Sequence, residues 1–147
     1  MGGTFEVQLA GTCAENCCEC CGVEGSNLTI TLENISNCED LDGATATLTW
    51  NPALPAPASA AGWEGTVNLP NCSESWDFQL ACIGLRETWD DFRLYFLTTE
   101  SECDIGSQAD PSSGSCDPFE LIFDLDGCTN TGCCNGAPKR YRVRITE

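Results

Sequence analysis

The amino-acid sequence predicts an all-β protein: an antiparallel β-sandwich, jelly-roll or immunoglobulin-like, of seven or eight strands stapled by disulfide bonds. Apolar and polar residues alternate in short runs, which is the pattern of half-buried strands. No segment keeps apolar residues at helical spacing over three turns, and the runs are rich in threonine, which favours strands. Thirteen cysteines in 147 residues approach the density that is typical of disulfide scaffolds.

Each predicted strand places its apolar side chains on one face, because successive side chains in a strand point to opposite sides. The first strand sets Leu28, Ile30 and Leu32 against Thr29 and Thr31. The strands are predicted, in order, over residues 27–33, 44–50, 65–69, 75–83, 92–97, 119–125 and 141–145, with a weaker one over residues 4–9. In the later strands the in-phase residues are Val67, Leu69, Trp76, Phe78, Leu80, Cys82, Phe92, Leu94, Phe96, Phe119, Leu121, Phe123, Leu125, Tyr141, Val143 and Ile145.

The segments between these strands complete one domain over residues 1–147. Residues 10–26 form a cysteine-rich N-terminal cap, and residues 85–91 allow a short helical turn. The Pro/Ala loop at residues 51–61 resists both helix and strand, so an extended arm that faces solvent or a partner is expected. Residues 101–118 are expected to form a polar loop.

The cysteines form a dense cluster at residues 17–21, a doublet at residues 133–134 and several single positions. The spacing favours disulfides, with Cys72 paired to Cys82 and Cys103 paired to Cys116. The disulfide candidates are Cys17, Cys18, Cys20, Cys21, Cys72, Cys82, Cys103, Cys116, Cys133 and Cys134. Because zinc sites use C-x-x-C, a zinc site built from Cys17, Cys20, Cys133 and Cys134 is an alternative. The odd count leaves at least one cysteine free, bound to metal or paired with another chain.

The charge and the residue types exclude several classes of function. With 23 acidic residues, six basic residues and no histidine, the net charge is −17. A histidine-dependent catalytic triad and a histidine metal site are therefore excluded, and binding to nucleic acid is disfavoured. No apolar run is long enough to predict a membrane span. The sequence therefore predicts a protein that is not an enzyme and needs no cofactor.

Two D-x-D-G motifs place aspartates where calcium could bind. They supply Asp40 and Asp42 in the first copy, and Asp124 and Asp126 in the second. Neither copy continues as an EF-hand, and Asp-Gly is common in turns, so turn formation is favoured over calcium binding.

The C-terminal strand carries the most distinctive charge pattern. Arg140, Arg142 and Arg144 alternate with apolar residues and should form a cationic stripe on one face. The favoured interpretation is internal ion pairing with acidic residues of neighbouring strands, and the alternative is docking to another subunit. The candidate partner-docking residues are Arg140, Arg142, Arg144, Pro52, Pro55 and Pro57.

In architecture, the chain resembles small cysteine-rich β-sandwich proteins of virions and cell surfaces. The resemblance rests on the cysteine clusters at residues 17–21 and 133–134, the threonine-rich strands and the terminal strand. It implies a location on a virion or outside the cell and transfers no site residue.

These observations favour a non-enzymatic structural protein of an extracellular assembly, most concretely a phage capsid cement, decoration or tail protein. Its partners would be other subunits of a symmetric assembly, as a homo-oligomer or bound to a capsid or fibre. Residues 1–7 lack the features of a signal peptide. The many cysteines then indicate a mature secreted form with an added Met, a zinc-binding protein, or a protein that is oxidised after release by lysis, as virion proteins can be. The alternatives are a secreted calcium- or glycan-binding adhesin or filament module, and a zinc-stabilised intracellular interaction protein.

Overall fold

The computed structural model describes residues 20–83, 88–97, 108–127 and 139–147. Within these residues the chain forms strands and short 3₁₀ helices, and every strand pairing is antiparallel. In order they are η1 (Cys20–Gly22), β1 (Leu28–Ser36), η2 (Glu39–Leu41), β2 (Thr45–Asn51), β3 (Gly62–Leu69), β4 (Glu74–Cys82), η3 (Trp89–Asp91), β5 (Phe92–Phe96), β6 (Gln108–Ala109), β7 (Ser113–Cys116), β8 (Phe119–Gly127) and β9 (Lys139–Thr146). The prediction of an all-β antiparallel fold is confirmed.

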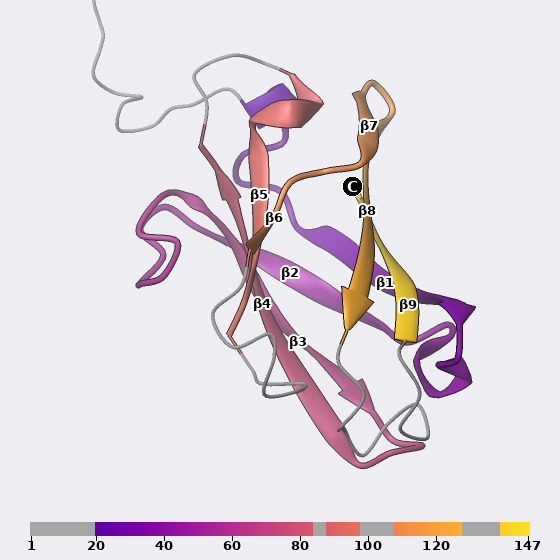
Figure 1. Cartoon of the computed structure of the whole chain (residues 1–147). Helices are drawn as coiled ribbons and strands as arrows, with labels where there is room; N and C mark the ends of the chain where they lie inside the picture. The colour runs from indigo at the N-terminus through magenta and orange to yellow at the C-terminus, as the bar shows by residue number, and fades with distance from the viewer. Residues whose placement is uncertain (1–19, 84–87, 98–107, 128–138) are drawn as a thin grey trace, which may run out of the picture.

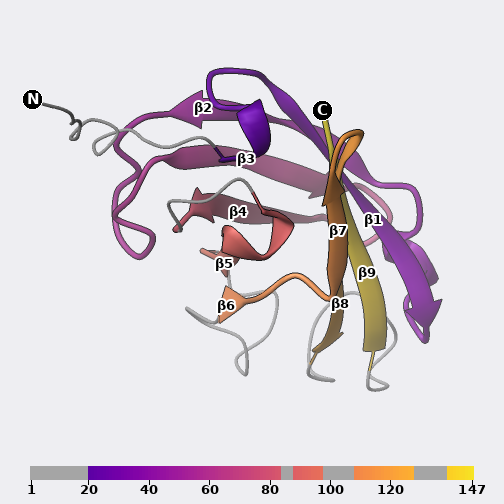
Figure 2. The same ribbon diagram turned by 90° about the horizontal axis from the view of Figure 1, so that it is seen from above.

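The strands form one nine-stranded sheet in the order β6-β5-β4-β3-β2-β1-β9-β8-β7 among the described residues, and this sheet curls into a half-barrel (Figure 1). The predicted sandwich of seven or eight strands is therefore replaced by a single curled sheet. The curl follows from the topology, since the two edge strands β6 and β7 are consecutive in the chain and only residues 110–112 join them. A connection of that length spans at most about 14 Å, so the two edges must approach each other. Figure 2 shows this connection from above.

Strand β2 carries the sheet around its bend. Its first four residues pair with β1, and its last three residues pair with β3. Strands that change partners in this way form the corners between differently oriented parts of a sheet. At one end of the curl, β7 packs closely against η3, because a Cβ added at Gly114 would lie 2.9 Å from the Cβ of Trp89.

The strands on the two sides of β2 form the two halves of the sheet, β3 to β6 on one side and β1, β9, β8 and β7 on the other. The core lies inside the curl, where the alternating apolar residues of these two halves meet. Aromatic rings join the two halves: the ring centroids of Trp76 and Tyr141 are 5.7 Å apart, and those of Phe92 and Phe119 are 5.4 Å apart. The in-phase residues predicted from the sequence are buried here, except for Leu125, which is half-buried.

Seven strands were predicted close to their observed positions, and two were not. Strands β6 and β7 lie within residues 101–118, where a polar loop was expected. The helical turn expected at residues 85–91 corresponds in part to η3. The weak strand predicted at residues 4–9 lies outside the described residues, as does the cap before Cys20.

Candidate functional site

Two adjacent cysteines of η1 tie the start of the described chain to both halves of the sheet. Cys20 is bonded to Cys82 at the end of β4, and Cys21 is bonded to Cys116 at the end of β7. The Cys20–Cys82 bond is buried, whereas both residues of the Cys21–Cys116 bond are half-buried. These two bonds hold the two halves of the curl together at one end.

The two cysteine pairings predicted from spacing are wrong. Cys72 precedes the nine-residue strand β4, and Cys82 is the last residue of that strand and is bonded to Cys20. A strand of that length is about 30 Å long, far beyond the roughly 7 Å that a disulfide can bridge between Cα atoms. Cys116 pairs with Cys21 and is therefore not the partner of Cys103, which lies outside the described residues.

All cysteines within the described residues are disulfide-bonded, including Cys38 and Cys72. The sulfur of Cys20 is therefore not a thiolate in this structure and does not serve the zinc alternative. The remaining cysteine candidates, Cys17, Cys18, Cys103, Cys133 and Cys134, lie outside the described residues.

The arginine stripe of β9 makes internal ion pairs, as the favoured interpretation predicted. Arg140 Nε lies 3.0 Å from Asp126 Oδ1, and Arg142 contacts both carboxylate oxygens of Asp124 at 2.7 and 3.2 Å. Both aspartates are the direct cross-strand partners of these arginines on β8. The hydrogen bond from Arg142 lowers the pKa of the Asp124 carboxyl.

Arg144 lies between two glutamates from different strands. Its Nε donates to Glu33 Oε2 of β1 at 2.8 Å, and its Nη1 donates to Glu120 of β8. These hydrogen bonds raise the pKa of the Arg144 guanidinium. The stripe therefore joins β1, β9 and β8 on the outer face of the sheet, and a further role in docking another subunit stays a prediction.

The two D-x-D-G motifs adopt different structures. In the first, Asp40 lies in η2, and Gly43 has φ +85° in the turn that follows. Asp42 Oδ1 accepts a hydrogen bond from the backbone N–H of Asn34. The second motif lies in strand β8, so its interpretation as a turn is wrong, and both of its aspartates face arginines. Among the described residues, no group of three acidic or cysteine side chains is arranged to hold a metal ion.

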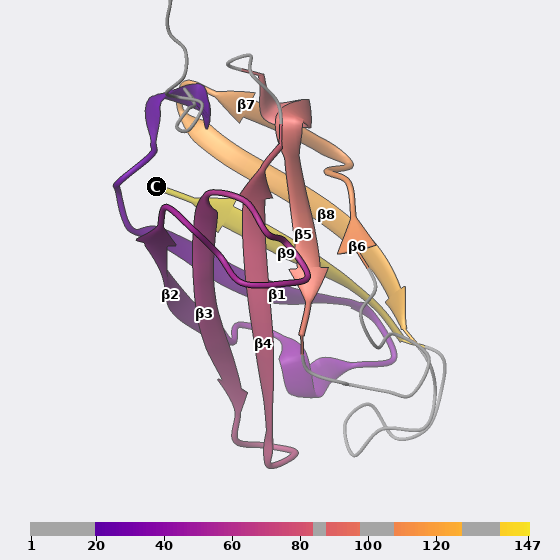
Figure 3. The same cartoon turned by 90° about the vertical axis from the view of Figure 1, so that its left-hand side faces the viewer.

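The Pro/Ala loop folds back over the outer face of the sheet, which corrects the expectation of an extended arm. Figure 3 shows the loop between β2 and β3 crossing in front of β4. The fully buried side chain of Gln79 holds it: Gln79 Nε2 donates to the Pro55 carbonyl at 3.1 Å, and Gln79 Oε1 accepts from the Ala58 amide at 3.1 Å. Leu54, a residue of the loop, is buried, so the loop has a defined conformation.

A surface without charged residues extends from β2 onto this loop. Residues 43–63 are the longest stretch of the sequence that lacks Asp, Glu, Lys and Arg. We define the uncharged surface by the exposed residues of this stretch in β2 and the following loop, which are Thr45, Thr47, Thr49, Pro52, Ala53, Pro55, Ala56, Pro57 and Ser59. The docking candidates Pro52, Pro55 and Pro57 lie in this surface, whereas its threonines on β2 were not predicted to belong to it. The sequence signal for the whole surface is the long absence of charged residues.

The uncharged surface lies on one side of the sheet. Thr49 pairs with Glu64, and Glu64 pairs with Gln79, so the threonines of β2 and the loop over Gln79 share a face. Glu64 is half-buried, and its Oε2 accepts a hydrogen bond from Asn51 Nδ2 at 3.0 Å. The carboxylate of Glu64, which lies on the same face, is thus engaged within the chain.

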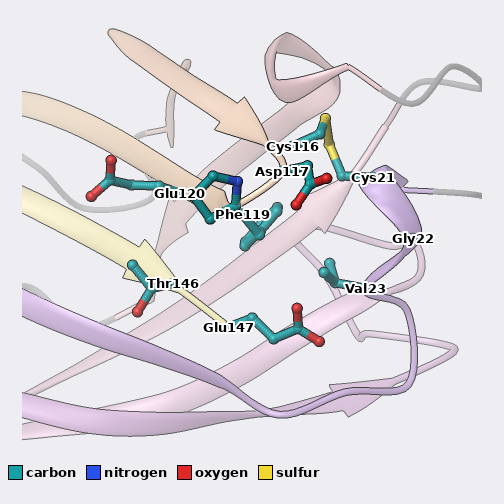
Figure 4. A pocket seen from close by; sticks show the side chains of 10 residues that line it. Cys21, Gly22, Val23, Cys116, Asp117, Phe119, Glu120, Thr146 and Glu147 are labelled. Atoms are coloured by element: carbon teal, nitrogen blue, oxygen red, sulfur yellow. A yellow bond between two sulfur atoms is a disulfide. The ribbon is translucent and has the colours of Figure 1, made fainter.

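A hollow of about 770 Å³ lies beside the Cys21–Cys116 disulfide, at the end of β9 (Figure 4). Val23 and Phe119 supply apolar lining, and the charged residues of the lining, Asp117, Glu120 and Glu147, are all acidic. Glu120 is already paired with Arg144.

Comparison with family models, with curated proteins and with solved structures gives no match for this chain. The helices of the described segments are too short to cross a membrane.

Proposed function

We propose that the chain is a non-enzymatic structural protein of an extracellular assembly, most concretely a virion surface protein of the capsid cement, decoration or tail type. The proposal is supported above all by the two disulfides that start from adjacent cysteines and reach both halves of the sheet.

Disulfide bonds indicate an oxidising, extracellular environment. In the chain-entropy account, bonds that close loops of 62 and 95 residues each stabilise the fold by about 4 to 5 kcal/mol when taken singly. Such stabilisation suits a protein that has to remain folded outside the cell.

The acidic composition supports the same proposal. A net charge of −17 keeps a protein soluble and opposes non-specific contact with nucleic acid and with other acidic proteins. Contact with a neighbouring subunit must then be made at a particular surface rather than by general attraction.

The test is a non-reducing peptide map of purified extracellular particles from the source. Pepsin is suitable because it works at low pH, where thiol–disulfide exchange is suppressed. We expect the chain to co-purify with particles, with peptides that contain Cys20 and Cys21 joined to those that contain Cys82 and Cys116. The same digest after reduction is the control and should release the separate peptides.

A cytoplasmic location with reduced cysteines would contradict the proposal. If the chain is found in the cytoplasmic fraction with Cys20, Cys21, Cys82 and Cys116 alkylated as free thiols, the proposed function is wrong.

A further inference from the structure

We infer that the uncharged surface is a self-association face, which docks against the same surface of a second copy of the chain. The inference deepens the proposed function and rests on it, since it names the neighbouring subunit as a second copy.

The net charge of the molecule restricts which surfaces of two copies can meet. Two copies with a net charge of −17 repel each other wherever carboxylates would meet. A symmetric dimer brings the same patch of both subunits together, so a patch rich in carboxylates would meet another patch rich in carboxylates. A basic partner, by contrast, would select the acidic surfaces. A face poor in carboxylates, such as this one, where Glu64 is half-buried and bonded to Asn51, is therefore what self-association of this chain requires.

The second step concerns the positive charges that could have relieved this repulsion. Four of the six basic residues, Arg93, Arg140, Arg142 and Arg144, are each paired with a carboxylate of their own chain. These arginines are thus already neutralised, and the acidic surface of a second copy gains little from them. Within the part of the chain that the structure describes, the uncharged surface is a region where a second copy meets little repulsion.

The third step is the rigidity of the surface. The side chain of Gln79 and the burial of Leu54 hold the loop in place, and the threonines lie on β2 between two paired strands. Because the surface is already ordered, association loses little conformational entropy. Exposed proline and alanine carbons and threonine methyl groups offer apolar contacts, while threonine hydroxyls offer hydrogen bonds.

The direction of the salt dependence follows from the same argument. Added salt screens the repulsion between the two acidic bodies but does not weaken an uncharged contact. Dimerisation should therefore strengthen as the sodium chloride concentration rises. A contact built from ion pairs would weaken instead.

Sedimentation equilibrium of the oxidised full chain over a range of protein and salt concentrations tests the inference. The test variant carries Ala53→Glu and Ala56→Glu, two exposed loop positions. The matched control carries Asn71→Glu and Ser113→Glu, which are also exposed and change the net charge by the same amount, but lie outside residues 43–63. A non-reducing peptide map checks that both variants keep their disulfides.

We expect a dimer that tightens with salt. The loop variant should weaken dimerisation by about a hundredfold or more, because four carboxylates would meet in one contact. The control should stay within about threefold of the unmodified chain.

Three results would overturn the inference: a monomer at all salt and protein concentrations, association that weakens with salt, or equal loss in both variants. None of them bears on whether the chain is present in extracellular particles, so failure of this inference is distinguishable from failure of the proposed function.

Discussion

The three arginines of β9 differ in how much their ion pairs stabilise the sheet. Arg140 and Asp126 have side chains that are 58% and 79% exposed, so their ion pair is strongly screened by water. Arg144 and Glu33 are 30% and 33% exposed, and Arg144 also contacts Glu120. A guanidinium shared by two carboxylates on different strands holds three strands in register, which an isolated surface pair does not do.

The pair of Arg142 and Asp124 gives a prediction about pH. Because the hydrogen bond from Arg142 lowers the pKa of Asp124 in the folded state, the pair stabilises the fold at neutral pH. This contribution begins to fall when the pH drops below about 4, the ordinary pKa of an aspartate. It is lost once the pH has fallen past the lowered pKa that Asp124 has in the folded state. In an Arg142→Gln variant, we expect the pKa of Asp124 to rise towards its ordinary value, as measured by NMR titration of the side-chain carboxyl carbon.

The control for this measurement is Arg140→Gln, which removes a neighbouring guanidinium but not the bonded one. It should move the pKa of Asp124 much less. A pKa of Asp124 that is unchanged in Arg142→Gln would show that the hydrogen bond is not the cause of the shift.

At the scale of elements, the longer strands were predictable and the sheet edges were not. Strands such as β1 and β9 alternate apolar and polar residues over six or seven positions, residues 28–33 and 140–146, and this local pattern survives in any β arrangement. Strand β6 has only two residues, and β7 consists of Ser, Gly, Ser and Cys. Their strand structure comes from tertiary pairing with β5 and β8, which no local pattern encodes.

The Pro/Ala loop shows the same limit. Its composition correctly indicated that residues 51–61 form neither a long helix nor a long strand, and that the prolines are exposed. Its packing depends on Gln79, which lies more than 20 positions away in the sequence from its two partners. Such a distant amide is not recognisable from the loop itself.

Replacing Gln79 therefore tests whether its side chain holds the loop in place. A Gln79→Met variant keeps nearly the same side-chain volume but leaves the Pro55 carbonyl and the Ala58 amide without their partner. We expect a loss of about 2 kcal/mol of unfolding free energy, measured by urea denaturation with the disulfides intact. Hydrogen exchange at the Ala58 amide should also become faster, because the loop would open locally.

The matched control is Asn68→Leu, an amide-to-apolar change at an exposed position of β3. It should change stability by less than about 0.5 kcal/mol. Equal effects of the two variants would mean that Gln79 does not hold the loop.

At the scale of the whole molecule, the arrangement of the strands decided which site predictions succeeded. The internal ion pairs of β9 were predictable because alternation alone places the arginines on one face, where neighbouring strands supply carboxylates. The cysteine pairings failed because proximity in sequence is a poor guide to proximity across a curled sheet. Cys20 meets Cys82 and Cys21 meets Cys116 only because the curl brings the ends of β4 and β7 to the same helix.

The two disulfides of η1 allow burial to be compared with loop-closure entropy. By loop length alone, the Cys21–Cys116 bond should stabilise the fold more, since it closes 95 rather than 62 residues. The difference in the chain-entropy account is only about 0.4 kcal/mol. Burial acts in the opposite direction, because Cys20 is 0% and Cys82 8% exposed, whereas Cys21 and Cys116 are half-buried. Serine hydroxyls placed at the buried positions without partners cost about 1–3 kcal/mol.

The burial term is the larger of the two, so the double variant Cys20→Ser/Cys82→Ser should be less stable than Cys21→Ser/Cys116→Ser. The second variant should instead show faster hydrogen exchange in β7, the edge strand that its bond secures. Urea denaturation and hydrogen exchange measure these effects, and a non-reducing peptide map checks that the remaining bond of η1 is unchanged. If Cys21→Ser/Cys116→Ser proves to be the less stable variant, loop closure outweighs burial, and η1 stabilises the curl mainly by restricting the unfolded chain.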